Sequence, residues 1–297
     1  MVVETNRYGN TEYRNGKIFR SAVMDGFELL LATWHFSDND DPSLENDRLR
    51  KLSPLIRNLV QKYQDVYIPD QKLCIDETIV PFRGRLRFRQ YMKNKKLKFG
   101  IKAYKLCCDG GYMYNLQVYC GSDCVQGGQA SANVVFSLMA GLFSSGRQLY
   151  TDNYYTSVSL ATELLDKTTH LIGTLTSNRK YNPKEVVQKK LKAKEVFAQE
   201  NEAGIVVLML STVHKDDLKQ VKQRGGKTDK PEVVVDYNQA KTFIDILDQI
   251  KSYSHCLLRG TKWYRKLAIK FLLGSEVVNA HLVYKEVTND KISMTEV

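Results

Sequence analysis

Two apolar runs that meet at an Asp-Gly-Gly turn restrict the fold of this chain more than any other feature of its sequence. Residues 99–106 and 112–119 are rich in aromatic and aliphatic side chains, and Asp109, Gly110 and Gly111 lie between them. Glycine adopts the positive φ angles that tight hairpin turns require, so this arrangement predicts two antiparallel strands joined by a short turn. The chain is therefore expected to contain a β-sheet.

Helical and extended patterns alternate along the rest of the chain. Ser53 followed by Pro54 is typical of a helix N-terminus, with Ser as the N-cap and Pro at the first helical position. We expect helices within 20–66 and at 131–143, 158–165, 239–252 and 262–284, and strands at 73–80, 99–106, 112–119, 148–151, 171–175 and 204–210. Helices, then strands interspersed with helices, then an insertion and more helices predict an α+β or mixed α/β fold.

Composition excludes several classes of protein. The 297 residues are 43% hydrophobic and 26% charged, which excludes wholesale disorder. The first 17 residues contain no apolar run typical of a secretory signal, and the longest strongly apolar stretch, residues 203–210, is far shorter than the roughly 20 residues that cross a bilayer. Six cysteines without a second Cys or Cys/His pair at ligand spacing argue against a zinc site. We expect an intracellular protein with no membrane segment.

Three aspartates are candidates for a metal site. Asp76 and Asp152 each lie at the end of an apolar run, and Asp245 lies in a later helix. Carboxylate and water oxygens are the ligands that Mg²⁺ prefers, and such sites keep positions open for phosphate. Two ions roughly 4 Å apart could promote displacement at a phosphodiester. Each aspartate also fits a turn or cap residue, and this alternative stays open at the level of residues alone.

A basic run between Arg83 and Lys105 contains ten of the 44 Lys and Arg residues and no acidic one, in a chain whose net charge is +11. Aromatic residues are interleaved with the charges, which is the pattern of a phosphate-binding surface with stacking platforms. A charged strand edge and a surface for single-stranded RNA are the alternatives. The candidate DNA contacts are Arg83, Arg85, Arg87, Arg89, Lys93, Lys95, Lys96, Lys98 and Lys102.

Three sequence blocks resemble the piggyBac transposase family and occur in the family's order. They are Cys74-Ile75-Asp76-Glu77 continuing to Lys98-Phe99-Gly100-Ile101-Lys102, Asp152-Asn153-Tyr154-Tyr155-Thr156-Ser157, and Tyr237-Asn238-Gln239-x-Lys241 continuing to Asp245-x-x-Asp248-Gln249. The resemblance implies an RNase H-like catalytic core with the triad Asp76, Asp152 and Asp245, and Asp248 matches an additional nearby aspartate. It implies Mg²⁺ or Mn²⁺ as cofactor, double-stranded DNA with transposon ends and a TTAA target as partner, a homodimer, and the nucleus as location.

The resemblance also implies a division into four segments. Residues 1–70 would belong to a partial helical dimerisation and DNA-binding region, 71–177 to the first part of the RNase H-like core, 178–235 to a basic inserted subdomain, and 236–297 to the second part of the core with C-terminal helices. Two departures stand out: Thr242-Phe243 replaces the family's Gly-Gly before the third aspartate, and no cysteine follows Cys256, so a C-terminal zinc module is not expected. We therefore expect a truncated or domesticated DNA transposase, with a catalytically inactive DNA-binding or scaffold protein as the alternative.

Overall fold

The computed structural model describes residues 26, 29–30, 33–93, 98–121, 130–182, 198–200, 206–215, 217–223, 226–253 and 262–289. The chain divides into two compact units, Met1–Pro54 and Leu55–Val297. In the first unit, a single 3₁₀ turn, η2 (Pro42–Leu44), is capped by the side chain of Asp41, which accepts the N–H of Ser43 at 2.9 Å. Helix α2 (Ser53–Val66) begins at Ser53, which confirms the predicted helix start.

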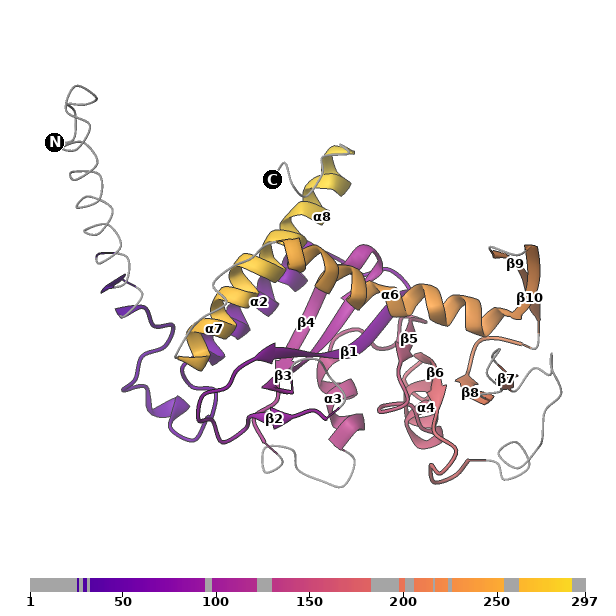
Figure 1. The fold of residues 1–297 in the computed structure, drawn as a ribbon, viewed down its shortest axis with the longest axis horizontal. Helices are drawn as coiled ribbons and strands as arrows, with labels where there is room; N and C mark the ends of the chain where they lie inside the picture. The colour runs from indigo at the N-terminus through magenta and orange to yellow at the C-terminus, as the bar shows by residue number, and fades with distance from the viewer. Residues whose placement is uncertain are drawn as a thin grey trace, which may run out of the picture. The chain divides into compact units, whose positions relative to one another are not determined.

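The second unit contains an eight-stranded mixed sheet, shown in Figure 1. Its strands are β1 (Lys72–Pro81), β2 (Gln90–Tyr91), β3 (Phe99–Cys108), β4 (Met113–Val118), β5 (Gln148–Thr151), β6 (His170–Leu175), β7 (Ala198–Glu200) and β8 (Val206–Ser211). The order is β2-β3-β1-β5-β6-β8-β7, and β4 pairs with β3. Strands β1, β5 and β6 are parallel, whereas β3 is antiparallel to β1, β2 and β4. The predicted hairpin and the mixed α/β class are confirmed.

Strand β1 is longer than an end at Asp76 would imply. Asp76 lies in the middle of β1, and the strand continues to Pro81 because its second half still pairs with β3. Its parallel neighbour β5 stops earlier, and the last pair of that ladder is Ile75 with Thr151. Asp76 and Asp152 are the next residues on the two strands, so the end of β5 opens the sheet beside both of them.

Helix α6 (Glu232–Tyr253) crosses one face of the sheet (Figure 1) and begins earlier than the expected residue 239. The expected segment boundary at 235 therefore falls inside this helix. A hairpin of β9 (Leu218–Gln223) and β10 (Gly226–Pro231) leads into it. The β3–β4 turn packs on α6 through Gly111, where an added Cβ would lie 3.1 Å from the backbone N of Leu247 and φ is +93°. Glycine at this position lets the turn and the helix approach closely.

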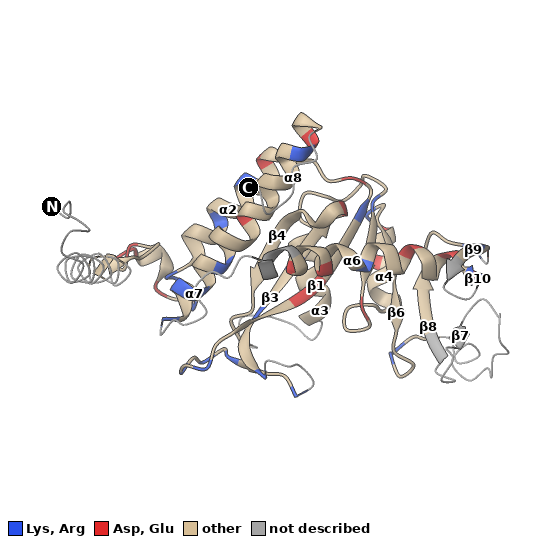
Figure 2. Cartoon of the chain, turned by 45° about the horizontal axis from the view of Figure 1, so that its top comes forward, with Lys and Arg blue, Asp and Glu red and all other residues tan. Residues whose placement is uncertain are grey.

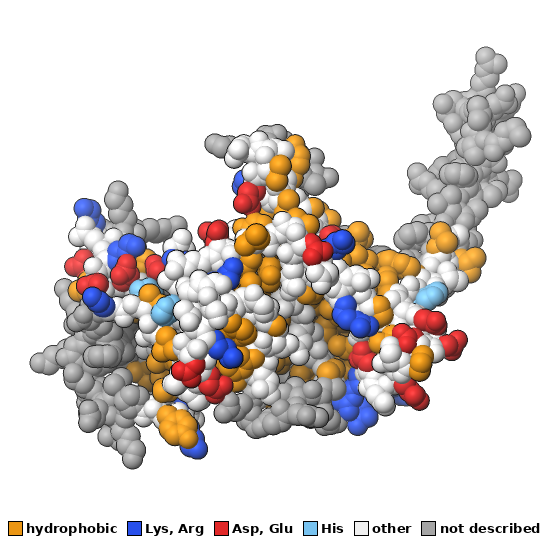
Figure 3. Space-filling view, turned by 180° about the vertical axis from the view of Figure 1, so that it is seen from behind, with side chains coloured by type: hydrophobic (Ala, Val, Ile, Leu, Met, Phe, Trp, Pro, Cys, Tyr) orange, Lys and Arg blue, Asp and Glu red, His pale blue; other side chains and the backbone are white. Residues whose placement is uncertain are grey.

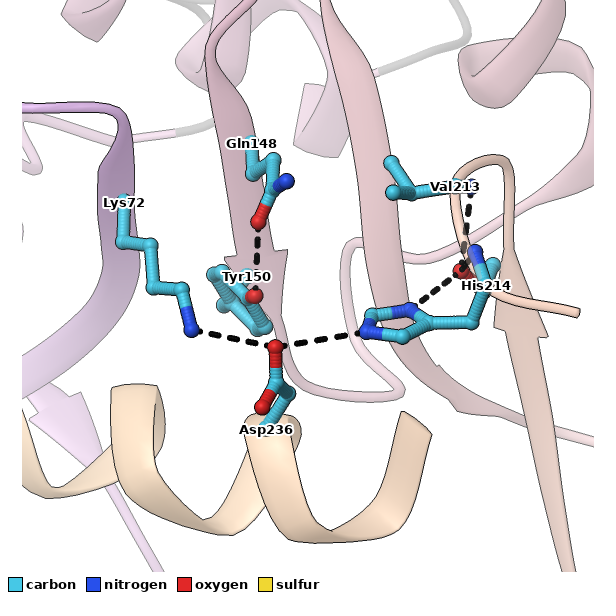
Figure 4. Close-up of polar contacts among 7 residues, drawn as sticks. Lys72, Gln148, Tyr150, Val213, His214 and Asp236 are labelled. Atoms are coloured by element: carbon cyan, nitrogen blue, oxygen red, sulfur yellow. Dashed lines mark hydrogen bonds and ion pairs between the residues drawn. The ribbon is translucent and has the colours of Figure 1, made fainter. Parts of the chain in front are cut away.

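Two polar anchors hold α6 against the sheet, and the first is shown in Figure 4. Asp236 accepts hydrogen bonds from Lys72 Nζ at 3.0 Å and from His214 Nε2 at 3.3 Å. Ser211 Oγ accepts the backbone N–H groups of Val213 and His214 and lies 2.9 Å from His214 Nδ1. Since this hydroxyl already accepts two hydrogen bonds, it is placed to donate its own proton to Nδ1, which leaves the Nε2 proton for Asp236. We call Lys72, Asp236 and His214 the clamp.

The second anchor lies further along the same helix. Asp248 accepts hydrogen bonds from Lys105 Nζ at 2.6 Å and from Thr78 Oγ1 at 2.9 Å. The Lys105 side chain is 1% exposed and that of Asp248 is 40% exposed. A buried lysine of β3 is thus neutralised by a carboxylate that reaches in from α6. Together the two anchors fix the helix segment that carries Asp245.

The C-terminal helices pack beside α2. Helices α7 (Trp263–Lys270) and α8 (Val277–Thr288) are joined by a π-helical stretch, η5 (Phe271–Glu276). Asn279 is tied to β4 by two hydrogen bonds with the backbone of Met113, at 2.9 and 2.8 Å. Hydrophobic side chains (orange) are visible along α8 in Figure 3. Of the α8 side chains, that of Val287 is 77% exposed.

The helical stretch Trp263–Thr288 contains an 18-residue window with a mean hydropathy of 1.2, and by length and composition it could span a bilayer. Half of this window is buried inside the protein, and core helices of soluble proteins pass the same criterion. The longest strongly apolar run in the sequence is 203–210. This helical stretch is not such a run, because charged and polar residues interrupt its apolar ones.

Candidate metal centre

The register of two parallel strands brings Asp76 and Asp152 together. Each is the residue after the final β1–β5 pair, so both lie at the same edge of the parallel ladder. Together with Glu77 they form a group in which one carboxylate oxygen of each residue lies within 4.8 Å of the others, and all three are half-buried. Figure 2 shows acidic residues (red) on β1 and on the nearby part of α6. We call Asp76, Glu77 and Asp152 the acidic group.

A tight turn after β5 aims the Asp152 side chain. The Asp152 carbonyl accepts the N–H groups of Tyr155 and Thr156 at 3.2 and 3.1 Å, and its Oδ1 accepts the N–H of Tyr154 at 2.9 Å. The Thr156 hydroxyl donates to the same carbonyl at 2.8 Å. On β6, a Cβ added to Gly173 would lie 2.2 Å from Thr156 Oγ1. Only glycine leaves room for this turn beside β6.

The electrostatics of Asp152 favour a cation. Burial raises the pKa of its carboxyl, and the charge of Asp76 raises it further. Backbone hydrogen bonds from Tyr154 and Tyr155 and the charge of Lys102 lower the pKa without offsetting the rise. Neighbouring carboxylates at this depth repel one another, and a divalent cation would relieve that repulsion. The all-oxygen donor set suits Mg²⁺ or Mn²⁺.

Glu77 was not anticipated from the sequence as part of this group. Adjacent residues of a strand point to opposite faces, so alternation argued against Glu77 sharing a site with Asp76. Its carboxylate nevertheless lies 3.8 Å from Lys102 Nζ, and the Tyr155 hydroxyl donates to it at 3.4 Å. The one local signal for Glu77 in the sequence was its position directly after Asp76.

Lys102 lies inside the site rather than on an exposed DNA-binding surface. It is 9% exposed, and its Nζ lies 4.5 Å from the Tyr154 ring centroid and 4.9 Å from that of Tyr104. Two aromatic rings and one carboxylate therefore hold this cation beside the acidic group. A role in balancing charge at the site fits this burial better than contact with a DNA backbone.

Asp245 and Asp248 both lie on α6 but have different surroundings. Burial raises the pKa of the Cys74 thiol, and the charges of Cys107, Asp76, Asp245 and Asp152 raise it further. Asp245 is exposed, and its charge raises the pKa of this thiol as those of Asp76 and Asp152 do, although the described carboxylates that cluster within 4.8 Å do not include Asp245. Asp248 is instead held by Lys105 and Thr78.

The Thr242-Phe243 departure is accommodated without a break in α6. The helix is continuous through both residues, Phe243 is 2% exposed, and Thr242 Oγ1 donates to the Gln239 carbonyl at 2.6 Å. Phe243 therefore contributes to the core beneath the helix. The backbone that carries Asp245 does not depend on glycines here.

Most of the remaining candidate DNA contacts lie at the end of the sheet near β2. Arg83, Arg85, Arg87, Lys93 and Lys98 are exposed, and Lys and Arg residues (blue) appear on the loops beside β3 in Figure 2. Arg89 is half-buried and donates to the carbonyls of Arg83 and Gly84 at 2.8 and 3.1 Å. Lys95 and Lys96 lie outside the described residues.

Comparison with known proteins identifies relatives over most of the chain. Residues 8–281 match the Transposase IS4 family. The human PiggyBac transposable element-derived protein 3 is 25% identical over 288 residues, covering 86% of this chain and 47% of the relative, and the human chimeric ERCC6-PGBD3 protein is equally similar over 26% of its length. The chain thus spans about half or less of these curated relatives.

The fold is also that of a solved transposase. The cryo-EM structure of a piggyBac transposase synaptic complex with hairpin DNA matches with a TM-score of 0.79 and 25% identity, over 90% of this chain and 59% of that one. That transposase has an RNase H-like core, so the mixed sheet described above is of this type. The chain belongs to the IS4/piggyBac-type transposase family.

Proposed function

We propose that this chain is the core of a piggyBac-like DNA transposase that cuts and joins DNA strands with the help of a divalent metal ion. The observation that carries the proposal is the acidic group, in which Asp76 and Asp152 meet at the end of β5 and the pKa of Asp152 is raised. A partly buried carboxylate with a perturbed pKa, beside other carboxylates in an opening of the sheet, is typical of a functional site. Family membership supplies the class of substrate.

The residues divide the work in this proposal. Asp76 and Asp152 hold the metal, Asp245 completes the carboxylate set from α6, and Asp248 keeps α6 in place through Lys105. A bound Mg²⁺ or Mn²⁺ would supply Lewis-acid activation of the attacking oxygen and stabilise charge at phosphorus. Double-stranded DNA with transposon ends and a TTAA target is the proposed substrate, the active form is a homodimer, and the protein acts in the nucleus.

A catalytically inactive DNA-binding protein is the competing function. The observation that favours it is Lys102, whose ammonium group lies 3.8 Å from Glu77 and already supplies one positive charge to the acidic group. If this cation balanced the carboxylates sufficiently, the site would not need a metal. The two functions therefore differ first in divalent metal affinity.

Calorimetry with Mg²⁺ and Mn²⁺, followed by cleavage of a labelled duplex, separates the two. We expect the wild type to bind metal and to nick the duplex, and Asp76→Asn to lose both properties. Asp166→Asn, which changes an exposed aspartate at the end of α4 (Val158–Leu165), is the matched control and should behave as the wild type. Wild-type protein that binds DNA but neither metal would establish the inactive alternative.

A further inference from the structure

Four aromatic residues between positions 82 and 99, in the basic run or directly before it, divide into an inward and an outward pair. Phe82 and Phe88 are 5% and 3% exposed, and the Phe88 ring packs edge-on against Trp263 with centroids 5.2 Å apart. Tyr91 and Phe99 are 56% and 39% exposed. The inward pair belongs to the core, so only Tyr91 and Phe99 can offer ring faces to a ligand.

The outward pair forms one continuous aromatic surface. Tyr91 and Phe99 are directly opposite each other in the β2–β3 ladder, with ring centroids 5.0 Å apart and planes inclined at 47°. The guanidinium of Arg89 lies 4.9 Å from the centroid of the Phe99 ring. We call Tyr91, Phe99 and Arg89 the aromatic platform.

The platform is held on a rigid base. Arg89 is fixed by two hydrogen bonds to the carbonyls of Arg83 and Gly84. Gly84 packs against the Phe82 ring, where an added Cβ would lie 2.6 Å from Cζ, and a Cβ added to Gly100 would lie 2.4 Å from the Ile79 side chain. These close contacts leave the loop and the strands little freedom. A pre-organised stacking surface loses less entropy on binding than a mobile one.

Charge around the platform points to a polyanion. Among the described residues, the exposed cations nearest in sequence are Arg83, Arg85, Arg87, Lys93 and Lys98. In the β1–β3 ladder, Lys105 is the residue opposite Asp76, and Phe99 lies six residues before Lys105 on β3. At roughly 3.3 Å per residue, the platform is therefore about 20 Å from the acidic group. That span is about six base steps of DNA at 3.4 Å each.

We propose that the aromatic platform stacks an unpaired nucleobase of the same DNA that the acidic group acts on. Bases inside a duplex are covered by their neighbours, so exposed rings gain most from a base that has left the stack. The surrounding cations bind the phosphates, which positions the strand without reading its sequence. The inference rests on the proposed function for the identity of the polymer and adds a subsite that favours locally unpaired DNA.

Binding in EDTA tests the platform independently of cleavage. Two DNA duplexes are compared, one fully paired and one with a single unpaired 2-aminopurine, and both affinity and fluorescence quenching are measured. We expect the wild type to bind the unpaired form about tenfold more tightly and to quench its fluorescence, since stacking on an aromatic side chain contributes that much or more. Tyr91→Ala and Phe99→Ala should lose the preference and the quenching while keeping affinity for the paired duplex.

Two control variants separate stacking from other effects. Tyr284→Ala removes another exposed tyrosine, on α8, and should leave the preference intact. Lys98→Ala should weaken binding to both duplexes equally and reduce its salt dependence.

The possible failures are distinguishable from one another. Equal affinity of the wild type for the two duplexes, or a preference that survives in folded Tyr91→Ala and Phe99→Ala, overturns the platform but leaves the proposed function standing. Stronger binding to an RNA oligomer with the same unpaired base overturns the assignment to DNA. Failure to bind any DNA contradicts the proposed function itself.

Discussion

Two carboxylates of the second unit, Asp152 and Asp236, lie in opposite electrostatic settings. Burial alone would raise the pKa of Asp236, but hydrogen bonds from Lys72 and His214, together with the charge of Lys72, outweigh this effect and hold the pKa below its usual range. Burial also raises the pKa of Asp152, and there the largest effect of a neighbouring charge comes from another carboxylate, Asp76, which raises the pKa further. The protein therefore compensates the charge of Asp236 more than fully, whereas it leaves the charge of Asp152 under-compensated.

The difference indicates which carboxylates serve the fold and which serve function. Both sites use β1, since Lys72 and Asp76 lie four residues apart on that strand. A carboxylate that accepts hydrogen bonds from two cationic or polar partners stabilises the native state. A carboxylate that is desolvated beside a like charge instead destabilises the native state. Proteins retain such a destabilisation at functional sites, where a bound ligand relieves it. The predictions below test this distinction, beginning with the largest expected effect.

The largest effect is expected on strand cleavage. Asp152→Asn removes a proposed metal ligand with little change of shape, and we expect the single-turnover cleavage rate to fall at least a thousandfold, about 4 kcal/mol in the barrier. Asp236→Asn should lower the rate less than tenfold at a temperature where the protein is folded. Cleavage of a labelled duplex at saturating Mg²⁺ measures both. Equal losses would show that the clamp and the acidic group are not functionally distinct.

The next effect concerns the second anchor and should depend on which partner is removed. Asp248→Leu leaves the ammonium group of Lys105 buried without its carboxylate, which should destabilise the protein by about 3 kcal/mol. Lys105→Met removes one partner of Asp248 but keeps the Thr78 hydrogen bond and the exposure of this carboxylate to solvent, and should cost about 1 kcal/mol or less. Urea denaturation of both variants measures the asymmetry. The double variant should resemble Lys105→Met, and equal single effects would contradict this account of the anchor.

A smaller effect is expected at the clamp and should depend on pH. Since folding lowers the pKa of Asp236, its stabilisation is present above the usual carboxyl pKa of about 4 and is lost as pH falls through the folded value. Asp236→Asn should cost about 2 kcal/mol at pH 7, and the gap to wild type should close on acidification. Thermal denaturation between pH 7 and pH 3 follows it.

An exposed ion pair provides the control for the clamp. Asp65 lies 3.9 Å from Lys62, with side chains 47% and 74% exposed. Asp65→Asn should change stability by less than about 0.5 kcal/mol at any pH in this range. A gap between Asp236→Asn and wild type that stays constant down to pH 3 would refute the ionic origin of the clamp's contribution.

The sequence predicted local features well because turn chemistry and apolar runs act locally. The Asp109–Gly111 turn and the end of β5 were found this way, and the parallel register then brings Asp76 and Asp152 together. The start of α6 was missed because Val233, Val234 and Val235 disfavour a helix locally, whereas packing against the sheet stabilises one.

Two features of the site depend on contacts that are distant in sequence. Lys102 belongs to a basic run, and only its burial against Tyr104 and Tyr154 turns it toward the carboxylates. Glu77 joins the acidic group although strand alternation argues against it. No spacing rule within either segment reports such packing.

The last predicted effect has the opposite sign from the others and tests the comparison most directly. Because the pKa of Asp152 is raised, its ionisation opposes folding, and this cost is fully present above the folded pKa and absent at low pH. Asp152→Asn keeps an oxygen for the Tyr154 N–H, so at pH 7 in EDTA we expect the variant to be more stable than wild type by about 1 kcal/mol. Millimolar Mg²⁺ should then raise the Tm of wild type but not of the variant, reversing or closing the gap, since a ligand stabilises only the protein that binds it. Differential scanning fluorimetry with and without Mg²⁺ measures both arms. A variant less stable than wild type in EDTA would mean that the Asp152 carboxylate supports the fold as Asp236 does, and charge balance would then no longer separate the two sites.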